Sequence, residues 1–274
     1  MSTPLDRYAV FGHPIGHSKS PRIHTLFAEA TRQHLIYYAE DVDLPQFDDA
    51  LARFLGLGGR GLNCTVPLKE AAFRRADELS PRARACGAVN TLVSRPDGSL
   101  FGDNTDGAGL VRDLRQNLGL ELAGRRLLVL GAGGAARGIL APLLEQAPER
   151  LVVANRTIER ARQLAEQFGV TACGFPDLEG ECFDLVLNAT AASLGGDVPP
   201  LPRRLLTDDG CCYDLAYGSE PTAFVRWGLA HGARLSIDGI GMLAEQAAEA
   251  FHLWRGVRPD TAPVIAELKA DRGF

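Results

Sequence analysis

Two charged residues at predicted helix starts have the side chains that acid–base chemistry needs. Lys69 follows the extended stretch "NCTVP", and Asp106 directly precedes the helical pattern "GAGLVRDLRQNL". The positive end of a helix dipole disfavours an ammonium and stabilises a carboxylate. If the two side chains meet, Asp106 would hold the Lys69 ammonium in place, and such a pair suits general acid–base catalysis. The alternative is that each residue is an ordinary surface charge or helix cap.

Three uncharged side chains could offer hydrogen bonds to a ligand. Thr65 lies in the same extended stretch, Asn90 stands at the entrance of a predicted β-hairpin, and Gln246 borders the apolar face of a C-terminal helix. A polar side chain beside a buried face needs a partner. That partner is either another core residue or a hydroxylated ligand. Considered one at a time, each of the three residues is better explained by a structural role.

A short polar segment, "GHSKSPRIH", precedes the first predicted helix. Ser20 followed by Pro21 is typical of a helix N-cap and a first helical residue. Apolar residues recur from Ile23 onward at helical spacing. This pattern explains Ser20 but gives Ser18 and Lys19 no structural role.

The stretch "LLVLGAGGAARGIL" has the order strand, glycine turn, helix. Gly131, Gly133 and Ala136 occupy the positions of the dinucleotide-binding pattern G-x-G-x-x-G/A. The first glycine allows the tight turn, the second lets the backbone approach a pyrophosphate, and the small third residue lets helix pack on strand. Backbone N–H groups at the helix start would bind the anion. A glycine turn without a ligand is the alternative.

The end of the next predicted strand selects between NAD and NADP. A site for NAD usually has an Asp or Glu there, which bonds to the ribose 2′-OH. Here the strand ends "VVANRTIER", with Asn155 at the place of the acid and Arg156 and Arg160 following. Two guanidinium groups without a carboxylate favour a 2′-phosphate, and therefore NADP. The alternative is that both arginines are solvated charges at a helix start.

These residues need elements that position them, and the apolar pattern predicts an α/β fold with two domains. The first domain is mixed, with a helix expected over 69–79 and a β-hairpin around Pro96-Asp97-Gly98. From Arg126, apolar strands alternate with helices, which indicates a Rossmann-type doubly wound parallel sheet. Two C-terminal helices are expected to return to the first domain. We predict boundaries of 1–106 for the substrate domain, 107–238 for the NADP-binding domain and 239–274 for the C-terminal helices.

Composition narrows the class of protein. The 274 residues are 46% hydrophobic and 23% charged, with a formal net charge of -5 and no basic patch, so a nucleic-acid partner is not expected. No apolar run approaches the ~18 residues of a membrane span, and the start "MSTPLDRYAVFG" does not resemble a signal peptide. Six scattered cysteines without zinc-site spacing predict free thiols, no metal and a cytoplasmic location. No heptad pattern is legible, so monomer and homodimer both stay open.

Several longer motifs occur together and in order along nearly the whole chain. They are "FGHPIGHSKSPRIH", "NCTVPLKEAAF", "GAVNTL", "GDNTDGAGL", "GAGGAARG", "NRTIERA", "DGIGMLAEQAAEAF" and "WRGVRPD". Together they resemble the bacterial, NADP-dependent shikimate dehydrogenase family. The resemblance implies the reversible, NADPH-dependent reduction of 3-dehydroshikimate to shikimate in aromatic amino-acid biosynthesis.

The resemblance also implies roles for single residues. Lys69 matches the family's acid–base lysine and Asp106 its paired aspartate. The substrate would be bound by Ser18, Ser20, Thr65, Lys69, Asn90, Asp106, Tyr217 and Gln246, with both serines at its carboxylate. NADP(H) would be bound by Gly131, Ala132, Gly133, Gly134, Ala135, Asn155, Arg156, Thr157, Arg160, Leu215 and Gly239.

The chain departs from the family pattern at four positions. His13 stands where Asn is common, Pro81 where an acidic residue often lies, Ala191 where Ser is usual, and Leu215 where Met is frequent. These departures bear on cofactor affinity and not on the reaction. Two rival functions remain: a quinate/shikimate dehydrogenase that uses NAD, and a non-catalytic NADP(H)-binding regulator on the same fold.

Overall fold

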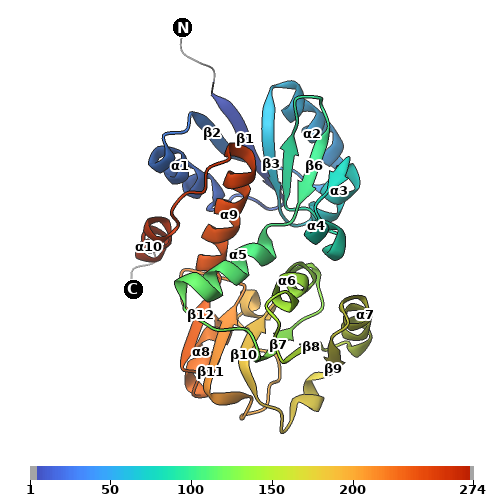
Figure 1. Cartoon of the computed structure of the whole chain (residues 1–274), viewed down its shortest axis with the longest axis vertical. Coiled ribbons are helices and arrows are strands. Elements are labelled where there is room, and N and C mark those ends of the chain that lie inside the picture. Colours follow the sequence, from blue (N-terminus) through green and yellow to red (C-terminus); the bar gives the residue numbers. More distant parts are fainter. Residues whose placement is uncertain (1–4, 272–274) are drawn as a thin grey trace. The chain divides into compact units, whose positions relative to one another are not determined.

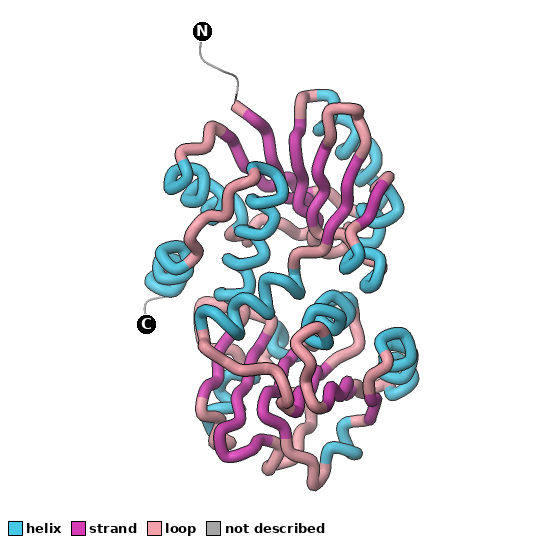
Figure 2. Tube along the Cα trace, in the orientation of Figure 1, coloured by secondary structure: helices cyan, strands magenta, loops and turns pink. Residues whose placement is uncertain are grey.

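The computed structural model describes residues 5–271, apart from the side chain of Leu194, and divides them into two compact units. The first unit contains residues up to Gly109 together with Leu243–Glu267, and the second contains Leu110–Met242 and the tail from Leu268. Each unit is built on one six-stranded sheet with helices on its faces (Figures 1 and 2). The predicted α/β class is therefore confirmed.

The first unit contains a mixed sheet with the strand order β2-β1-β3-β5-β6-β4. Its strands are β1 (Asp6–Gly12), β2 (Leu35–Asp41), β3 (Gly59–Cys64), β4 (Glu78–Leu79), β5 (Thr91–Ser94) and β6 (Leu100–Asp103). The β1–β2 and β1–β3 pairs are parallel, whereas β3–β5 and β5–β6 are antiparallel. The β5–β6 pair is the predicted hairpin, and Gly98 in its turn has a φ of +85°.

Helices cover both faces of this sheet. They are α1 (Ser20–Thr31), α2 (Phe47–Gly56), α3 (Lys69–Arg75), α4 (Pro81–Cys86), most of α9 (Ile240–Arg255) and of α10 (Ala262–Ala270), and the 3₁₀ turn η1 (Leu44–Gln46). Successive residues of a strand point to opposite faces. Accordingly, Ala9 and Phe11 pack with α2 and α3, whereas Tyr8 packs on Trp254 of α9 at 4.9 Å between ring centroids.

The helix predicted over 69–79 is wrong in its second half. Helix α3 ends at Arg75, and Glu78 and Leu79 form strand β4 beside β6. The backbone N–H of Asp77 donates to the carbonyl of Leu100 at 2.9 Å, and the N–H of Leu100 donates back to the Asp77 carboxylate at 2.8 Å. Pairing with the sheet edge therefore replaces the last helical turn.

The second unit has a wholly parallel sheet with the strand order β12-β11-β10-β7-β8-β9. Its strands are β7 (Arg126–Leu130), β8 (Arg150–Ala154), β9 (Thr171–Cys173), β10 (Phe183–Asn188), β11 (Leu206–Asp214) and β12 (Leu235–Asp238). Counted within the unit, this is the order 3-2-1-4-5-6 reversed, the arrangement of doubly wound dinucleotide-binding folds. The predicted Rossmann-type sheet is confirmed.

Two layers of helix bury this sheet. The helical segments are the end of α5 (Asp106–Arg112), the π-helix η2 (Asp113–Asn117), α6 (Gly134–Leu144), α7 (Ile158–Phe168), α8 (Ala223–Ala230), and the 3₁₀ turns η3 (Phe175–Leu178) and η4 (Ala192–Gly195). Leu127 and Val129 of β7 face α5, α6 and α7, whereas Leu128 and Leu130 face α8 and η3. Burial on both sides explains why these strands are continuous apolar runs.

Among residues 5–271, no helix combines the length and apolar character that crossing a membrane requires. The same residues contain no group of three or more His, Cys, Asp or Glu side chains arranged to hold a metal ion. All six cysteines are free thiols, and only Cys173 and Cys182 are not fully buried.

Candidate active site

The two residues with acid–base character are joined in the first unit. Lys69 is the first residue of α3 and Asp106 the first residue of α5. The Lys69 Nζ donates to Asp106 Oδ2 at 2.5 Å, and the two side chains are 28% and 16% exposed. The pair is thus partly desolvated, which strengthens its electrostatic interaction, and still reachable by a ligand.

Asn90 holds the other oxygen of the same carboxylate. Its Nδ2 donates to Asp106 Oδ1 at 2.8 Å and to Thr105 Oγ1 at 3.0 Å. Its Oδ1 accepts from the Thr105 backbone N–H at 2.9 Å and from the Thr91 hydroxyl at 2.9 Å. Both N–H groups and both lone pairs of this buried carboxamide are therefore engaged within the protein.

Gln246 reaches the same cluster from helix α9. Its Oε1 lies 3.5 Å from the Thr105 hydroxyl, and its Nε2 donates to the Leu243 carbonyl at 2.9 Å. The close approach of α5 to α9 requires Gly109, because a Cβ there would stand 2.5 Å from the Gln246 nitrogen. The missing side chain thus sets the distance between Gln246 and the segment that carries Asp106.

Thr65 lies on the loop after β3, and Ser18 on the loop after β1 that leads to Ser20 at the start of α1. The Thr65 N–H donates to the Phe11 carbonyl at 2.9 Å, and a side chain at Gly12 would overlap Thr65 Cγ2. Ser20 is not the helix N-cap that the sequence predicts. It is the first residue of α1, Lys19 is the N-cap without a side-chain cap bond, and the Ser20 N–H donates to Ser18 Oγ at 3.3 Å.

An exposed ion pair braces the loop that leads to these serines. His13 Nδ1 lies 2.5 Å from Asp41 Oδ1, and the Ile15 N–H donates to Asp41 Oδ2 at 3.3 Å. The hydrogen bond and the charge of Asp41 raise the pKa of His13 above its ordinary value. The histidine that departs from the family pattern is therefore tied to the neighbouring strand β2.

Tyr217 is the one predicted substrate residue that belongs to the second unit, where it lies half-buried in the loop after β11. The other predicted substrate residues belong to the first unit. Within that unit, Lys69 and Asn90 both bind Asp106 directly, and Thr105 connects Asn90 to Gln246.

The glycine loop of the second unit fits a dinucleotide phosphate. Gly131 has a φ of +104°, and a Cβ there would stand 3.0 Å from the Ala189 carbonyl oxygen, so only glycine suits this turn. Gly133 and Gly134 face open space where a side chain would project. Helix α6 begins at Gly134 with Ala136 fully buried against the strand, which leaves its first N–H groups available to an anion.

The arginine segment stands beside that loop. Strands β7 and β8 are parallel neighbours, and the Gly131 N–H donates to the Ala154 carbonyl at 2.7 Å. Asn155 Nδ2 donates to the Thr157 carbonyl at 2.9 Å, which shapes the turn into α7. Arg156 and Arg160 are exposed, and within the described residues neither has a carboxylate partner. Their charges are therefore available to a phosphate.

Leu215 and Gly239 lie together at the carboxyl ends of β11 and β12. A Cβ at Gly239 would overlap the Leu215 carbonyl, so the two segments touch through backbone. The sequence analysis did not single out Asn188 and Asp214, the last residues of β10 and β11. Buried Asp214 accepts from Asn188 Nδ2 at 3.0 Å and from the Thr222 hydroxyl at 2.6 Å. A polar residue closing an apolar strand, as in "LVLN" and "CCYD", is a signal that could have identified both.

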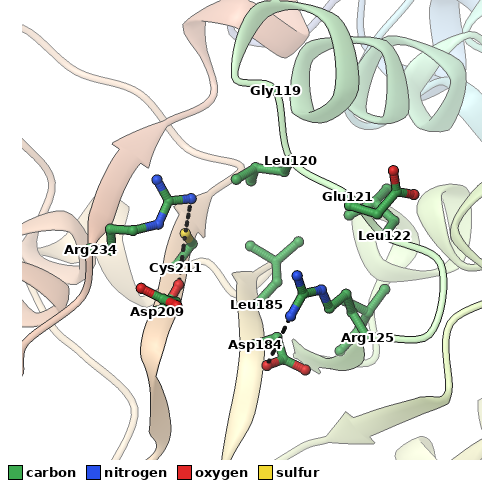
Figure 3. Close-up of a pocket in the computed structure, with 11 residues that line it drawn as sticks. Gly119, Leu120, Glu121, Leu122, Arg125, Asp184, Leu185, Asp209, Cys211 and Arg234 are labelled. Atoms are coloured by element: carbon green, nitrogen blue, oxygen red, sulfur yellow. Dashed lines mark hydrogen bonds and ion pairs between the residues drawn. The ribbon is translucent and has the colours of Figure 1, made fainter.

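The second unit also has a cavity of about 330 Å³, whose lining includes Glu121, Arg125 and Arg234 (Figure 3). Leu127 and Leu185 line it at the amino ends of β7 and β10, whereas the glycine loop follows the carboxyl end of β7. Arg234 reaches Cys211 Sγ at 3.5 Å, and Arg125 reaches Asp184 at 4.0 Å. The cavity therefore lies at the amino ends of the strands, and the predicted NADP site lies at their carboxyl ends.

Comparison with known proteins identifies the family. The model described as "Shikimate dehydrogenase substrate binding domain" matches residues 10–92. The model described as "Shikimate / quinate 5-dehydrogenase" matches residues 113–194, and "Shikimate 5'-dehydrogenase C-terminal domain" matches residues 239–269. Together these matches span well over half of the chain, in the order that the motifs predict.

Whole-chain relatives agree with this match. A "Shikimate dehydrogenase (NADP(+))" from Methylococcus capsulatus is 63% identical, covering 98% of this chain and 98% of the relative. An Ael1 enzyme from Pseudomonas putida has a similar structure, with a TM-score of 0.91 and 48% identity over 96% of this chain and 98% of that one. The Thermus thermophilus shikimate 5-dehydrogenase in complex with NADP(H) and shikimate gives a TM-score of 0.88 and 38% identity, over 98% and 100% of the chains. The resemblance seen in the motifs is thus confirmed, and the chain belongs to the shikimate dehydrogenase family.

Proposed function

We propose that this chain catalyses the reversible, NADPH-dependent reduction of 3-dehydroshikimate to shikimate, a step of aromatic amino-acid biosynthesis. The observation that carries the proposal is the bond between Lys69 Nζ and Asp106 Oδ2 in a half-buried site. An amine held by a carboxylate can deliver a proton to a carbonyl oxygen as that oxygen gains negative charge. A non-catalytic regulator would have no need of such a pair.

The first unit, with the C-terminal helix α9, would bind the substrate. Ser18 and Ser20 would donate their hydroxyls to its carboxylate, close to the N-terminus of α1, where an anion is favoured. Thr65, Asn90 and Gln246 would bind the ring hydroxyls. Because every hydrogen-bonding position of the Asn90 carboxamide is engaged within the protein, a ring hydroxyl must exchange with one of its present partners. Tyr217 would contribute from the second unit.

The second unit would bind NADP(H), whose nicotinamide supplies the hydride that reduces C3 of the substrate. The open backbone at Gly133 and Gly134 fits a pyrophosphate, and the exposed guanidinium groups of Arg156 and Arg160 fit a 2′-phosphate. The full predicted set is Gly131, Ala132, Gly133, Gly134, Ala135, Asn155, Arg156, Thr157, Arg160, Leu215 and Gly239.

In the reduction, Lys69 would hold its Nζ toward the oxygen on C3 and give it a proton. Asp106 does not donate, because its two oxygens accept from Lys69 and Asn90. It would fix the direction of the ammonium. Preorganised charge of this kind lowers the barrier without reorganisation during the reaction.

The test is the absorbance of reduced nicotinamide, measured while shikimate or quinate is oxidised with NADP⁺ or NAD⁺. We expect the highest kcat/KM with shikimate and NADP⁺. Faster oxidation of quinate with NAD⁺ would assign the chain to the quinate branch. No nicotinamide reduction in any of the four combinations would refute an enzymatic role.

Lys69→Ala should lower kcat by ~10² or more, with a smaller change in the KM for shikimate, because the proton donor is lost. Lys269→Ala, an exposed lysine of α10, is the matched control and should leave both constants unchanged. A Lys69→Ala variant with the kcat of the parent would remove the catalytic role from this residue.

We also propose that the enzyme works in the cytoplasm, where a reducing environment suits six free thiols. It would act there as a monomer or a homodimer, and sedimentation velocity distinguishes the two. The location is tested by titrating accessible thiols in freshly lysed cells. Oxidised thiols at the half-buried Cys173 and Cys182 would contradict a cytoplasmic location.

A further inference from the structure

A line of buried hydrogen bonds crosses the first sheet and ends on the candidate catalytic carboxylate. It begins at Tyr37 of β2, whose hydroxyl donates to Asn63 Oδ1 at 2.7 Å. Asn63 Nδ2 donates to Thr91 Oγ1 at 3.0 Å, and Thr91 Oγ1 donates to Asn90 Oδ1 at 2.9 Å. Asn90 Nδ2 then donates to Asp106 Oδ1.

Sheet register brings the middle of this line together. Asn63 of β3 and Thr91 of β5 are directly opposite partners in an antiparallel pair, so their side chains share one face of the sheet. Thr91 is 0% exposed and so reaches no ligand in solution. Its only role in the line is to connect two carboxamides.

The donors in this line run in a single direction. A carboxylate only accepts, so Asn90 must present its N–H group to Asp106 and its oxygen to Thr91. The single hydroxyl hydrogen of Thr91 is then committed to Asn90, and its oxygen must accept from Asn63. This in turn points Asn63 Oδ1 at the Tyr37 hydroxyl. A flip of either carboxamide would place acceptors against each other.

The first donor of the line is kept in its neutral form. Burial raises the pKa of Tyr37 well above its ordinary value, although a hydrogen bond from Ser20 opposes this rise. The Tyr37 ring stacks on His24 at 4.1 Å between centroids and 10° between planes. Burial lowers the pKa of His24 to about 3, so an uncharged ring supports the phenol.

We propose that Tyr37 and Thr91 are positioning residues for the reaction. Through Asn63 they fix the Asn90 carboxamide, and through Asn90 they fix the Asp106 carboxylate that orients Lys69. The role of these two residues rests on the function proposed above.

The main test replaces Thr91 by Val, which keeps the shape and removes the hydroxyl's hydrogen bonds to Asn63 and Asn90 together with its 3.4 Å contact with the Thr105 hydroxyl. Since a small misplacement of a catalytic group costs up to ~10²-fold, we expect kcat for shikimate oxidation to fall about tenfold. The KM for NADP⁺ should stay unchanged. The primary isotope effect with shikimate deuterated at C3 should rise, because the chemical step becomes more rate-limiting. Thr91→Ser restores the hydroxyl and should return kcat to within about twofold of the parent.

A double variant separates positioning from simple destabilisation. In an Asp106→Asn background, Thr91→Val should lower kcat by less than about twofold further, because the line acts through this carboxylate. Equal falls in both backgrounds, or equal effects of Val and Ser, would overturn the proposal. Inactivity of the parent enzyme would instead refute the proposed function.

Tyr37→Phe tests the other end of the line and covers the case in which Thr91→Val does not fold. It keeps the ring stacked on His24 and removes only the donor to Asn63. We expect kcat to fall about threefold in the parent and to be unchanged in the Asp106→Asn background. An unaltered kcat in the parent would overturn the proposal.

Discussion

Arg82 neutralises a carboxylate that the first unit buries almost completely. The Asp103 side chain is 3% exposed, and Arg82 binds it through two hydrogen bonds, from Nε to Oδ1 at 2.8 Å and from Nη2 to Oδ2 at 2.5 Å. Burial by itself would raise the pKa of Asp103, but the hydrogen bonds and charge of Arg82 bring that pKa below its ordinary value. Arg82 also donates to Glu249 of α9 at 3.0 Å. Arg82→Met keeps most of the side-chain volume and removes the charge.

The cost follows from leaving Asp103 without its cation. Breaking a buried ion pair on one side costs about 3–5 kcal/mol, because the remaining charge stays desolvated. The Ser80 hydroxyl and the Asn104 N–H still donate to Asp103, so the lower end, about 3 kcal/mol, applies here. For a chain of this size, about 3 kcal/mol corresponds to a Tm lower by roughly 6–12 °C.

The assay is thermal unfolding followed by circular dichroism over a range of pH. The folded pKa of Asp103 is depressed, so its contribution to stability is present above the unfolded value of about 4 and is lost as the pH falls through the folded value. Without Arg82, burial raises the pKa of Asp103, so the variant's carboxyl takes up a proton at a higher pH than the parent's. The Tm difference between parent and Arg82→Met should therefore be full near neutral pH and shrink as the pH falls from the variant's raised pKa toward the parent's lowered one.

A matched control uses an exposed pair of the same unit. Arg95 binds Glu78 at 2.6 Å with side chains 36% and 52% exposed, so water screens the pair and Arg95→Met should lower Tm much less than Arg82→Met does. If Arg82→Met lowers Tm no more than Arg95→Met does, the buried-charge reasoning is wrong. A Tm difference that does not change with pH would equally contradict it.

Two further predictions concern the cofactor and the substrate site. Arg156→Ala should raise the KM for NADPH about tenfold or more and the KM for NADH less than about twofold, because only NADPH carries the 2′-phosphate. Steady-state kinetics with both cofactors measures the two constants, and equal changes would show that Arg156 does not bind the 2′-phosphate. Gly109→Ala should lower kcat/KM for shikimate by ~10², because its Cβ would stand 2.5 Å from the Gln246 nitrogen and push α9 away from Asp106. The control is Gly56→Ala at the end of α2, where nothing lies within 4 Å; a kcat/KM for Gly109→Ala equal to that of this control would refute the packing argument.

Much of the second unit could be predicted from sequence, because its physics is local. A strand buried on both faces must be a continuous apolar run, as "RLLVL" and "RLVVA" are, and each run precedes a helix with its own apolar stripe. The glycine turn was predictable for the same reason, since Gly131 needs a positive φ that few other residues adopt.

The first unit was harder, because its elements are decided by partners distant in sequence. The apolar spacing through Leu79 suits a helix, yet β6 captures Glu78 and Leu79 as an edge strand. Likewise the types of Lys69 and Asp106 indicated acid–base chemistry. The supporting line through Tyr37, Asn63 and Thr91, by contrast, depends on the register of four neighbouring strands, β2, β1, β3 and β5. Side chains that look ordinary in sequence become connected only when that register is known.

The return of α9 has a consequence for the order in which the protein can be made. Residues Leu243–Glu267 complete the first unit, so that unit lacks Gln246, Glu249 and Trp254 until the ribosome has translated nearly the whole chain. The second unit, apart from its tail from Leu268, ends at Met242, so its whole sheet is made before these residues. During synthesis the nascent chain therefore holds an unfinished amino-terminal half, with the apolar surface that α9 will cover still open, and chaperone demand should be greatest there.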